Sequence, residues 1–316
     1  MTTPSIPTVL VGVDGSAHSL EALDFAADEA LLRDGALRVV NVIHWPVLEI
    51  ASAPERAPAI DGTLIRDARS EVDAAARRAA RRHPGLRVTT AVIAGTPASV
   101  LIEESDTAEL LVVGSRGRGG FAGLVTGSAV SQVASNARCP VVVARRPSRE
   151  QTDEAEGPVV VGVDGSPHSI RAVEFAFDEA SRRGVPLVAV AVWSEPLHPS
   201  NGGQKRAEDE AGAAEAAATR ALAEALAAYR SRYPGLSVRS ELIRSTDTEE
   251  ALVQRSAGAA LTVVGSRGRG ELAGAVLGSV GQALIHHAES PVAIVRPEPQ
   301  PEPDPEPEQE QKPADA

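Results

Sequence analysis

Val9-Leu-Val-Gly-Val-Asp-Gly-Ser16 is the first apolar segment of the chain, and it returns as Val159-Val-Val-Gly-Val-Asp-Gly-Ser166. Each copy begins with a run of apolar, mostly β-branched residues, which is typical of a buried parallel strand. The Asp-Gly-Ser that follows predicts a turn in which a serine caps the next helix. Both segments therefore predict a strand, a turn and a helix.

Other segments repeat at almost the same spacing. The stretch Val112-Val-Gly-Ser-Arg-Gly-Arg-Gly119 returns over residues 263–270, and Cys139-Pro-Val-Val-Val143 returns as Ser290-Pro-Val-Ala-Ile294. The offset is 150 residues at the start of the unit and 151 at its end. A whole domain is therefore duplicated, which differs from an array of short repeats.

Each copy alternates strand and helix patterns. Strands are expected in the first copy over residues 9–13, 37–43, 87–93, 110–113 and 141–144. This alternation predicts an α/β protein of two tandem doubly wound domains, each a five-stranded parallel sheet flanked by helices. Ligands of such sheets bind beyond the carboxyl ends of the strands, where the strand order reverses.

We expect the first domain over residues 1–147, a polar linker over 148–157, and the second domain over 158–296. Residues 297–316 alternate proline with acidic residues and carry half of the chain's net charge of −12. Such a segment cannot build an apolar core, so we expect it to be disordered. A solubilising tail and a partner-binding tail are both consistent with this composition.

Composition excludes several classes of protein. The 316 residues include 31 Lys and Arg against 43 Asp and Glu, which argues against a general nucleic-acid binder. The single cysteine, Cys139, excludes a disulfide framework and a cysteine zinc site. Neither a long apolar run nor a secretory signal pattern is present, so we expect a cytoplasmic protein without membrane contact.

Residues 114–128 and 265–279 form a glycine-rich loop after the fourth strand of each copy. Glycines allow the backbone to approach phosphate oxygens and to direct N–H groups at them. A helix is expected from near Leu124 and Ala275, and its first turn would favour an anion. Four arginines add positive charge: Arg116, Arg118, Arg267 and Arg269.

Other interpretations of this loop are weaker. A flexible glycine connection beside a packed helix remains the plain structural alternative. A P-loop is excluded because the chain's lysines, Lys205 and Lys312, lie far from both loops. The sequence Gly117–Ala122 matches G-x-G-x-x-A, but it follows the fourth strand and therefore does not indicate dinucleotide binding.

The spacing G-x2-G-x9-G-[ST] resembles the ATP-binding signature of the universal stress protein family. Its residues here are Gly114, Gly117, Gly127 and Ser128, and Gly265, Gly268, Gly278 and Ser279. The opening Val-Gly-Val-Asp-Gly-Ser and the Cys-Pro-Val-Val-Val segment also resemble this family, so the likeness covers nearly all of residues 8–296. It implies a tandem member with a Rossmann-like, adenine nucleotide alpha hydrolase-like fold.

The resemblance implies one ATP site per domain, with Mg²⁺ on the phosphates and no metal ligand from protein side chains. Gly12 and Gly162 would leave room for the nucleotide. Asp14 and Asp164 match the family's acidic position beside the nucleotide, and the backbone of Val42 and Val190 would contact the adenine edge. The loops would hold ribose and phosphates through Gly114, Ser115, Arg116, Gly117, Arg118, Gly119, Gly127 and Ser128, and through Gly265, Ser266, Arg267, Gly268, Arg269, Gly270, Gly278 and Ser279.

The second copy departs from the first after its third strand, where Thr246-Asp-Thr248 replaces Gly95-Thr-Pro97. Asp247 or Thr246 can still cap a helix, so the fold is expected to hold. The geometry of the second site is expected to differ, and the two affinities need not be equal.

The function expected from the resemblance is nucleotide-dependent regulation of a stress response. A slow ATPase or phosphotransferase is an alternative, although Asp14 and Asp164 are the only acids near the site and no catalytic residue is assigned. A scaffold that binds no nucleotide is a third. The resemblance also implies that the two fifth strands pair, and it leaves a homodimer and a regulatory protein partner open.

Overall fold

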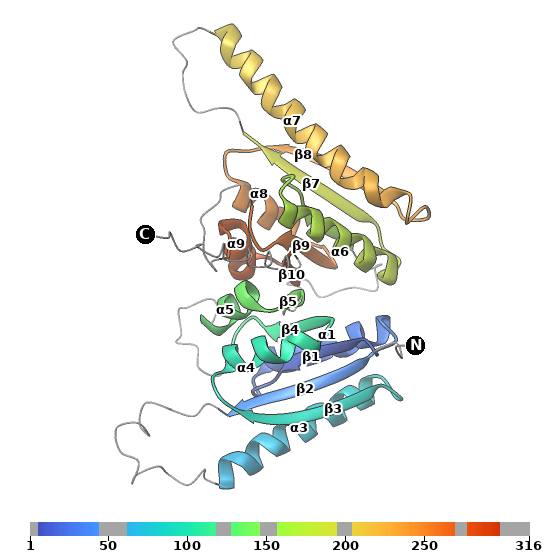
Figure 1. Cartoon of the computed structure of the whole chain (residues 1–316), viewed down its shortest axis with the longest axis vertical. Helices are drawn as coiled ribbons and strands as arrows, with labels where there is room; N and C mark the ends of the chain where they lie inside the picture. Colours follow the sequence, from blue (N-terminus) through green and yellow to red (C-terminus); the bar gives the residue numbers. More distant parts are fainter. Residues whose placement is uncertain are drawn as a thin grey trace, which may run out of the picture.

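The protein is described by a computed structural model over residues 6–43, 62–117, 128–145, 157–194, 204–268 and 277–297. These residues form two α/β halves with the same order of elements, as the sequence predicts (Figure 1). The first half contains β1 (Thr8–Gly12), α1 (Ala17–Leu32), β2 (Ala36–Ile43), α3 (Gly62–Arg82), β3 (Arg87–Ala94), α4 (Pro97–Glu104), the 3₁₀ turn η2 (Ser105–Thr107), β4 (Leu110–Gly114), α5 (Ser128–Asn136) and β5 (Val141–Ala144). The second contains β6 (Val159–Gly162), α6 (Pro167–Arg183), β7 (Leu187–Trp193), α7 (Gln204–Arg230), β8 (Val238–Arg244), α8 (Thr248–Arg255), β9 (Leu261–Gly265), α9 (Ser279–His287) and β10 (Val292–Val295).

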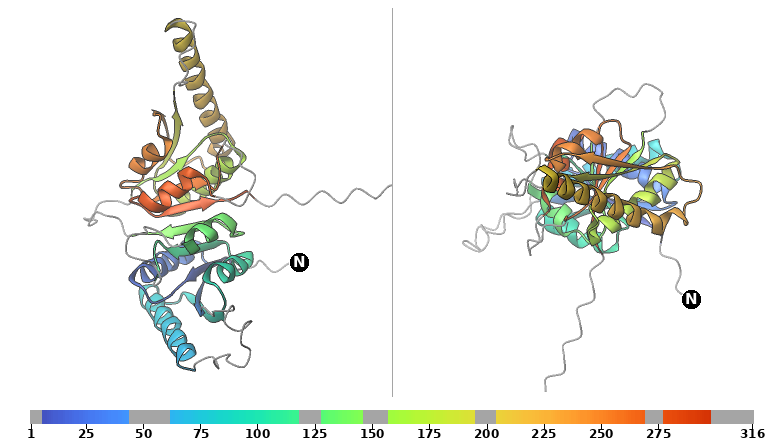
Figure 2. Two further views of the ribbon diagram at one scale, coloured as in Figure 1. Left: turned by 90° about the vertical axis from the view of Figure 1, so that its left-hand side faces the viewer. Right: turned by 90° about the horizontal axis from the view of Figure 1, so that it is seen from above.

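The strands form one sheet in the order β3-β2-β1-β4-β5-β10-β9-β6-β7-β8. Within each half the five strands are parallel, and β5 and β10 pair antiparallel with Val142 opposite Ala293. The halves are therefore stacked along the long axis of the molecule (Figure 1), with α3 and α7 at opposite ends (Figure 2). The predicted fold class, with doubly wound sheets in tandem, is confirmed.

Two apolar layers cover the sheet, one on each face. Successive residues of a strand point to opposite faces, so Val9 and Val11 belong to one layer and Leu10 to the other. The first layer lies under α1, α3, α6 and α7, and the second under α4, α5, α8 and α9. Each layer contains residues of both halves.

Serine caps begin α1 and α6, as the Asp-Gly-Ser turns predict. The Ser16 hydroxyl accepts a hydrogen bond from the backbone N–H of Ser19 (3.2 Å), and Ser166 does the same for Ser169 (3.2 Å). The turns place Gly15 and Gly165 at φ of 77° and 80°, in the left-handed region that favours glycine. The same local sequence therefore gives the same strand–turn–helix in both halves.

The helix after the second glycine loop begins later than expected. Its first residue is Ser279, not a residue near Ala275, and Gly278 is its extended N-cap. The backbone N–H of Gly278 donates to the carbonyl of Ser266 (3.0 Å), which holds it against the end of β9 and outside the helix. In the first half α5 begins at Ser128, and residues 118–127 lie outside the described residues.

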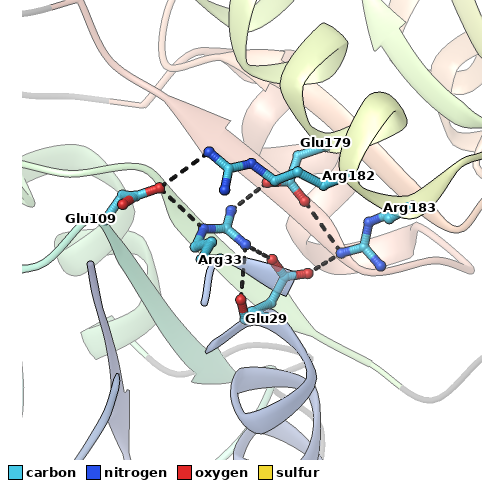
Figure 3. A network of polar contacts seen from close by, with 6 residues as sticks. All are labelled: Glu29, Arg33, Glu109, Glu179, Arg182 and Arg183. Atoms are coloured by element: carbon cyan, nitrogen blue, oxygen red, sulfur yellow. Dashed lines mark hydrogen bonds and ion pairs between the residues drawn. The ribbon is translucent and has the colours of Figure 1, made fainter. Parts of the chain in front are cut away.

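A buried ionic network joins α1 of the first half to α6 of the second (Figure 3). The Arg33 guanidinium contacts Glu29 and Glu179, and Arg183 contacts the same two carboxylates. The side chains of Glu29 and Glu179 are each 1% exposed. Glu109 extends the network to the surface, at 3.4 Å from Arg33 Nε and 3.6 Å from Arg182 Nη2.

Two expected segments cannot be compared with the structure: the linker, over most of its length, and the acidic tail after Pro297 lie outside the described residues. None of the described helices combines the length and the apolar character that a membrane span requires.

Candidate nucleotide site

The candidate site lies at the carboxyl ends of two adjacent parallel strands in each half. The chain runs outward from β1 to β2 and β3 and then returns to β4 on the other side of β1, so the strand order reverses between β1 and β4. Asp14 follows β1, and the glycine loop follows β4. Strand β6 and strand β9 bring Asp164 and the second loop together in the same way.

The two carboxylate oxygens of each aspartate have different surroundings. Asp14 Oδ1 accepts a hydrogen bond from the backbone N–H of Ser16 (3.0 Å), and Asp164 Oδ1 accepts one from Ser166 (2.9 Å). The other oxygen faces the glycine loop. A Cβ atom added at Gly117 would lie 2.8 Å from Asp14 Oδ2, and one at Gly268 would lie 2.9 Å from Asp164 Oδ2.

The first glycine of each loop has a different role. A Cβ atom at Gly114 would lie 2.7 Å from the carbonyl oxygen of His18, and one at Gly265 would lie 2.8 Å from the backbone of His168. These glycines therefore allow the first helix of each half to pack against the end of the fourth strand. They have a packing function, whereas Gly117 and Gly268 keep space in front of the aspartate.

The N-terminus of α9 opens onto the same place. Its N-cap residue, Gly278, has no side chain to accept a hydrogen bond from the first turn, unlike Ser166 at the start of α6. Unpaired N–H groups at a helix start attract anions, and the helix dipole adds to this attraction. A Cβ atom at Gly278 would make only ordinary contacts, the nearest at 3.5 Å, so this glycine is not required by packing within the described chain.

A cavity of about 450 Å³ brings the second set of predicted residues together. Its lining includes Gly162, Asp164, Val190, Gly265, Arg267, Gly268, Gly278 and Ser279. The end of the cavity away from the glycine loop is lined by apolar and small residues of β7 and α7, among them Ala191, Val192 and Ala221. The cavity thus combines apolar and small residues of β7 and α7 with the start of a helix and an arginine of the glycine loop.

Several predicted residues are not placed in this cavity. Ser266 is 4% exposed and its hydroxyl lies 3.0 Å from His168 Nδ1, so it faces the protein; Ser115 is similarly buried. Ser128 is the first residue of α5, and its side chain is not described. The remaining loop residues lie outside the described residues: Arg118, Gly119, Gly127, Arg269 and Gly270.

The two valines expected beside the adenine do not occupy equivalent positions. Val190 lies opposite Gly162, and the residue opposite Gly12 is Val40, not Val42. The carbonyl of Val190 also accepts a hydrogen bond from the Val163 N–H (2.8 Å) and is held in the sheet. The equivalent of Val42 is therefore Val192, which also lines the cavity.

Three further lining residues come from the segment where the second copy departs from the first: Thr246, Thr248 and Glu249. Thr248 and Glu249 occupy the positions of Pro97 and Ala98 in the first half, since they follow the N-cap residues Asp247 and Thr96. Thr246 is an extra residue, because Ser245 donates to the end of β7 as Gly95 donates to the end of β2. The departure was visible in the sequence. Glu249 was not recognised as a site residue, because a glutamate in the first turn of a helix is also expected from its favourable interaction with the helix dipole. Ala218 and Ala221 were missed because alanines at helical spacing look the same as core residues.

The equivalent region of the first half is more polar. Asn41 replaces Ala191, Glu71 replaces Ala221, and the Asn41 amide donates to Glu71 Oε2 at 2.8 Å. A hollow of about 450 Å³ lies between α3 and the ends of β2 and β3. Its lining contains none of the predicted residues, since it includes Ile43, Arg69 and Thr90 but no part of the loop.

The histidines next to the two loops have different environments. Burial, and after it the positive charges of Arg267 and Arg296, lower the pKa of His168. Its ring is therefore neutral at physiological pH, and Nδ1 lies beside the Ser266 hydroxyl. His18 Nδ1 lies 3.5 Å from Glu21, with 39% of its side chain exposed.

This arrangement brings groups of different chemical character together in one cavity. The cavity gives an apolar end for a base, a carboxylate oxygen for hydroxyl groups and a helix start with an arginine for phosphates. Over the described residues, His, Cys, Asp and Glu do not gather into a group of three that could hold a metal ion.

Comparison with known proteins identifies the family. The model of the universal stress protein family matches residues 6–145 and again 157–296. The chain belongs to this family. A universal stress protein of Mycobacterium tuberculosis is 38% identical over 297 residues, which cover 91% of this chain and 96% of the relative. The tandem organisation is thus shared with curated family members over nearly their whole length.

A solved universal stress protein has the same fold over most of the chain. The crystal structure of one from Archaeoglobus fulgidus has a TM-score of 0.64 and 21% identity, covering 92% of this chain and 98% of that one. Another from this organism, solved in complex with dAMP, covers 44% of this chain and 97% of that one, with 22% identity and a TM-score of 0.33.

Proposed function

We propose that this universal stress protein is a nucleotide-dependent stress-response regulator that binds one ATP in each domain. The proposed domains are residues 1–147 and 158–296, with 148–157 as linker and 297–316 as a disordered tail. The observation that carries the proposal is the cavity of about 450 Å³ in the second half, where Asp164, the glycine loop and the start of α9 converge. A volume of this size is typical of a small-molecule site.

The features of the cavity suggest how ATP would lie. Its base would lie against Ala191, Val192 and Ala221, and ribose hydroxyls would donate to Asp164 Oδ2. The phosphates would accept hydrogen bonds from the loop and from the first turn of α9, with Mg²⁺ bound to them. In the first half Gly12, Asp14, Val42 and the loop residues Gly114 to Ser128 would do the same, with Asn41 and Glu71 at the base end.

The site supports regulation rather than turnover. Efficient hydrolysis needs a base that is itself oriented and a group that stabilises the charge developing on the phosphates. Asp164 Oδ1 is used in the turn, and His168 is directed to Ser266. We therefore assign no catalytic residue.

The first test is the nucleotide content of protein purified without added nucleotide. The protein is denatured, and the released nucleotide is identified by mass spectrometry and counted by chromatography. Two ATP per chain support the proposal. One ATP per chain would restrict ATP binding to one half, and ADP would favour slow hydrolysis. If the protein contains no nucleotide and does not bind Mg-ATP in a titration, the alternative of a scaffold that binds no nucleotide would be favoured.

A pair of variants links binding to the loop. In Gly117→Val and Gly268→Val the new Cβ lies within 3 Å of an aspartate oxygen, so the carboxylate or the loop must shift, and the rest of the valine side chain fills space in front of the aspartate. We expect each variant to lose one of the two ATP sites. Gly212→Val in α7 is the control, because a Cβ atom there has no neighbour within 4 Å. If both loop variants bind two ATP, the loop is not the site.

A further inference from the structure

An arginine follows the last strand of each half, in a position that the nucleotide signature does not include. Arg145 comes directly after β5, and Arg296 directly after β10. In the parallel pairs β4–β5 and β9–β10, Ala144 lies opposite Gly114 and Val295 lies opposite Gly265. Each arginine therefore leaves the sheet beside the first residues of its own glycine loop.

The second half shows this closeness directly, since the backbone N–H of Ser266 donates to the carbonyl of Val295 (2.8 Å). The next residues of the two segments, Arg267 and Arg296, are both positively charged. The pKa of Arg296 is lowered by burial and, after it, by the charge of Arg267. The pKa of Arg145 is lowered by burial and by Arg116 in the same way. Two arginines that repel one another thus lie beside the first residues of each glycine loop.

Both arginines are held by the opposite half of the molecule. Arg145 Nη1 donates to the carbonyls of His286 and Ala288, at 3.3 and 3.2 Å, at the end of α9. Arg296 Nη1 donates to the carbonyl of Ser135 near the end of α5. Cations are favourable at a helix C-terminus, so these contacts fix each side chain across the interface.

Arg145 still has hydrogen-bonding capacity after these contacts. Its Nε and Nη2 atoms are buried and have no hydrogen-bond partner within the described part of the chain. Leaving buried charged donors unpaired is costly, and a second arginine nearby increases the cost. An anion between the two guanidinium groups would satisfy the donors and offset the repulsion.

We propose that Arg145 and Arg296 are further phosphate-binding residues of the two nucleotide sites, each positioned by the other half of the protein. Arg145 acts with Arg116, and Arg296 acts with Arg267, on the phosphates of a nucleotide whose base lies at the far end of the cavity. Each site is then complete only when the two halves are paired. This inference rests on the proposed nucleotide binding and identifies further residues that would recognise the phosphates.

The test compares ligands with and without phosphates on the full-length protein. ATP and adenosine are titrated by calorimetry into the wild type, Arg145→Gln, Arg296→Gln and the double variant. Because a charge-assisted hydrogen bond is lost at each site, we expect the double variant to bind ATP about tenfold more weakly or worse, with adenosine affinity within about twofold of wild type. Each single variant should weaken one of the two sites. Arg145→Lys, which keeps the charge, should retain part of the ATP affinity.

Arg138→Gln is the matched control, because Arg138 is an exposed arginine near β5 that pairs with Asp106 (2.9 Å) away from the loop. It should bind both ligands as the wild type does. Unchanged ATP affinity in the double variant, or an equal loss for ATP and adenosine, would overturn this inference and leave the arginines as interface contacts only. If the wild type binds neither ligand, the proposed function itself fails, and this inference fails with it.

Discussion

Asp164 serves the fold with one carboxylate oxygen and faces the glycine loop with the other. The two roles can be separated by substitution. Asp164→Asn retains an oxygen that can accept from the Ser166 N–H, so the turn and the cap of α6 should persist. Asp164→Ala removes this acceptor and should lower the free energy of unfolding by about 1–3 kcal/mol in urea denaturation.

ATP binding should respond differently from stability, because both Asp164→Asn and Asp164→Ala should weaken it. Both remove the second carboxylate oxygen beside Gly268, which would accept from the ribose hydroxyls. Both should therefore weaken ATP binding at the second site, measured by calorimetry, while the first site keeps its affinity. The equivalent substitution Asp14→Asn is the matched control and should affect the first site alone. Equal stability of the Asn and Ala variants would show that the turn does not depend on Oδ1.

At the scale of elements, the sequence predicts the strands well because a parallel strand covered on both faces must be almost wholly apolar. The pairing of Val190 with Val42 was wrong, because the offset of 150 residues between the copies makes Val190 the equivalent of Val40, as the strand register confirms. The start of α9 was placed too early because the hydrogen bond from Gly278 to Ser266 joins residues from two separate elements. Such tertiary contacts leave no local pattern.

The same limit applies to the site. Asp164, Gly268 and Gly278 follow strand ends or precede a helix, so topology alone places them near one another. Ala218 and Ala221 come from the middle of α7, and their sequence pattern indicates only a packed face. The residues that line the cavity from α7 can therefore be identified only from the packing of α7 against β7 in the structure.

A single substitution in α7 tests this part of the cavity. Ala221→Glu introduces the residue found at the equivalent position 71, but without the Asn41 partner, because Ala191 lies opposite. An unpaired carboxylate at the apolar end should weaken nucleotide binding at the second site by about tenfold or more. Ala217→Glu, on the exposed face of α7, is the control and should bind as the wild type does. Retained affinity in Ala221→Glu would place the base elsewhere.

At the scale of the whole molecule, the buried network between α1 and α6 makes stability depend on pH (Figure 3). Burial, and after it the charge of Glu179, raises the pKa of Glu29 from 4.5 to about 7 in the folded protein, against the effect of Arg183 and Arg33. Between these two values the folded state binds more protons than the unfolded state. Stability from this group should therefore be greatest at low pH and should decrease as the pH rises from 4.5 to about 7.

Urea denaturation at pH 5, 6, 7 and 8 measures this effect. Glu29→Gln imitates the protonated side chain, so its free energy of unfolding should match the wild type near pH 5 and exceed it at pH 8, by on the order of 1–3 kcal/mol. Glu224→Gln, on the exposed face of α7, is the control and should keep the wild-type dependence. Parallel curves for the wild type and Glu29→Gln would show that Glu29 is ionised throughout.

Substitutions in the network also test how the two halves are held together. Glu29 and Glu179 are almost completely buried, and above pH 7, where Glu29 is ionised, their charges are balanced by Arg33 and Arg183. Arg33→Met leaves two buried carboxylates with one guanidinium and should lower the free energy of unfolding by about 3–5 kcal/mol.

Replacing all four charges, Glu29 and Glu179 by Leu and Arg33 and Arg183 by Met, leaves an apolar interface of similar volume. Since the cost of removing charges from water then disappears, most of the lost stability should return. If instead the fourfold variant is less stable than Arg33→Met, the ions themselves hold the halves together, and the shared sheet through β5 and β10 depends on them. If Arg33→Met costs little, the network is open to water, and the interface rests on the strand pairing and the apolar layers alone.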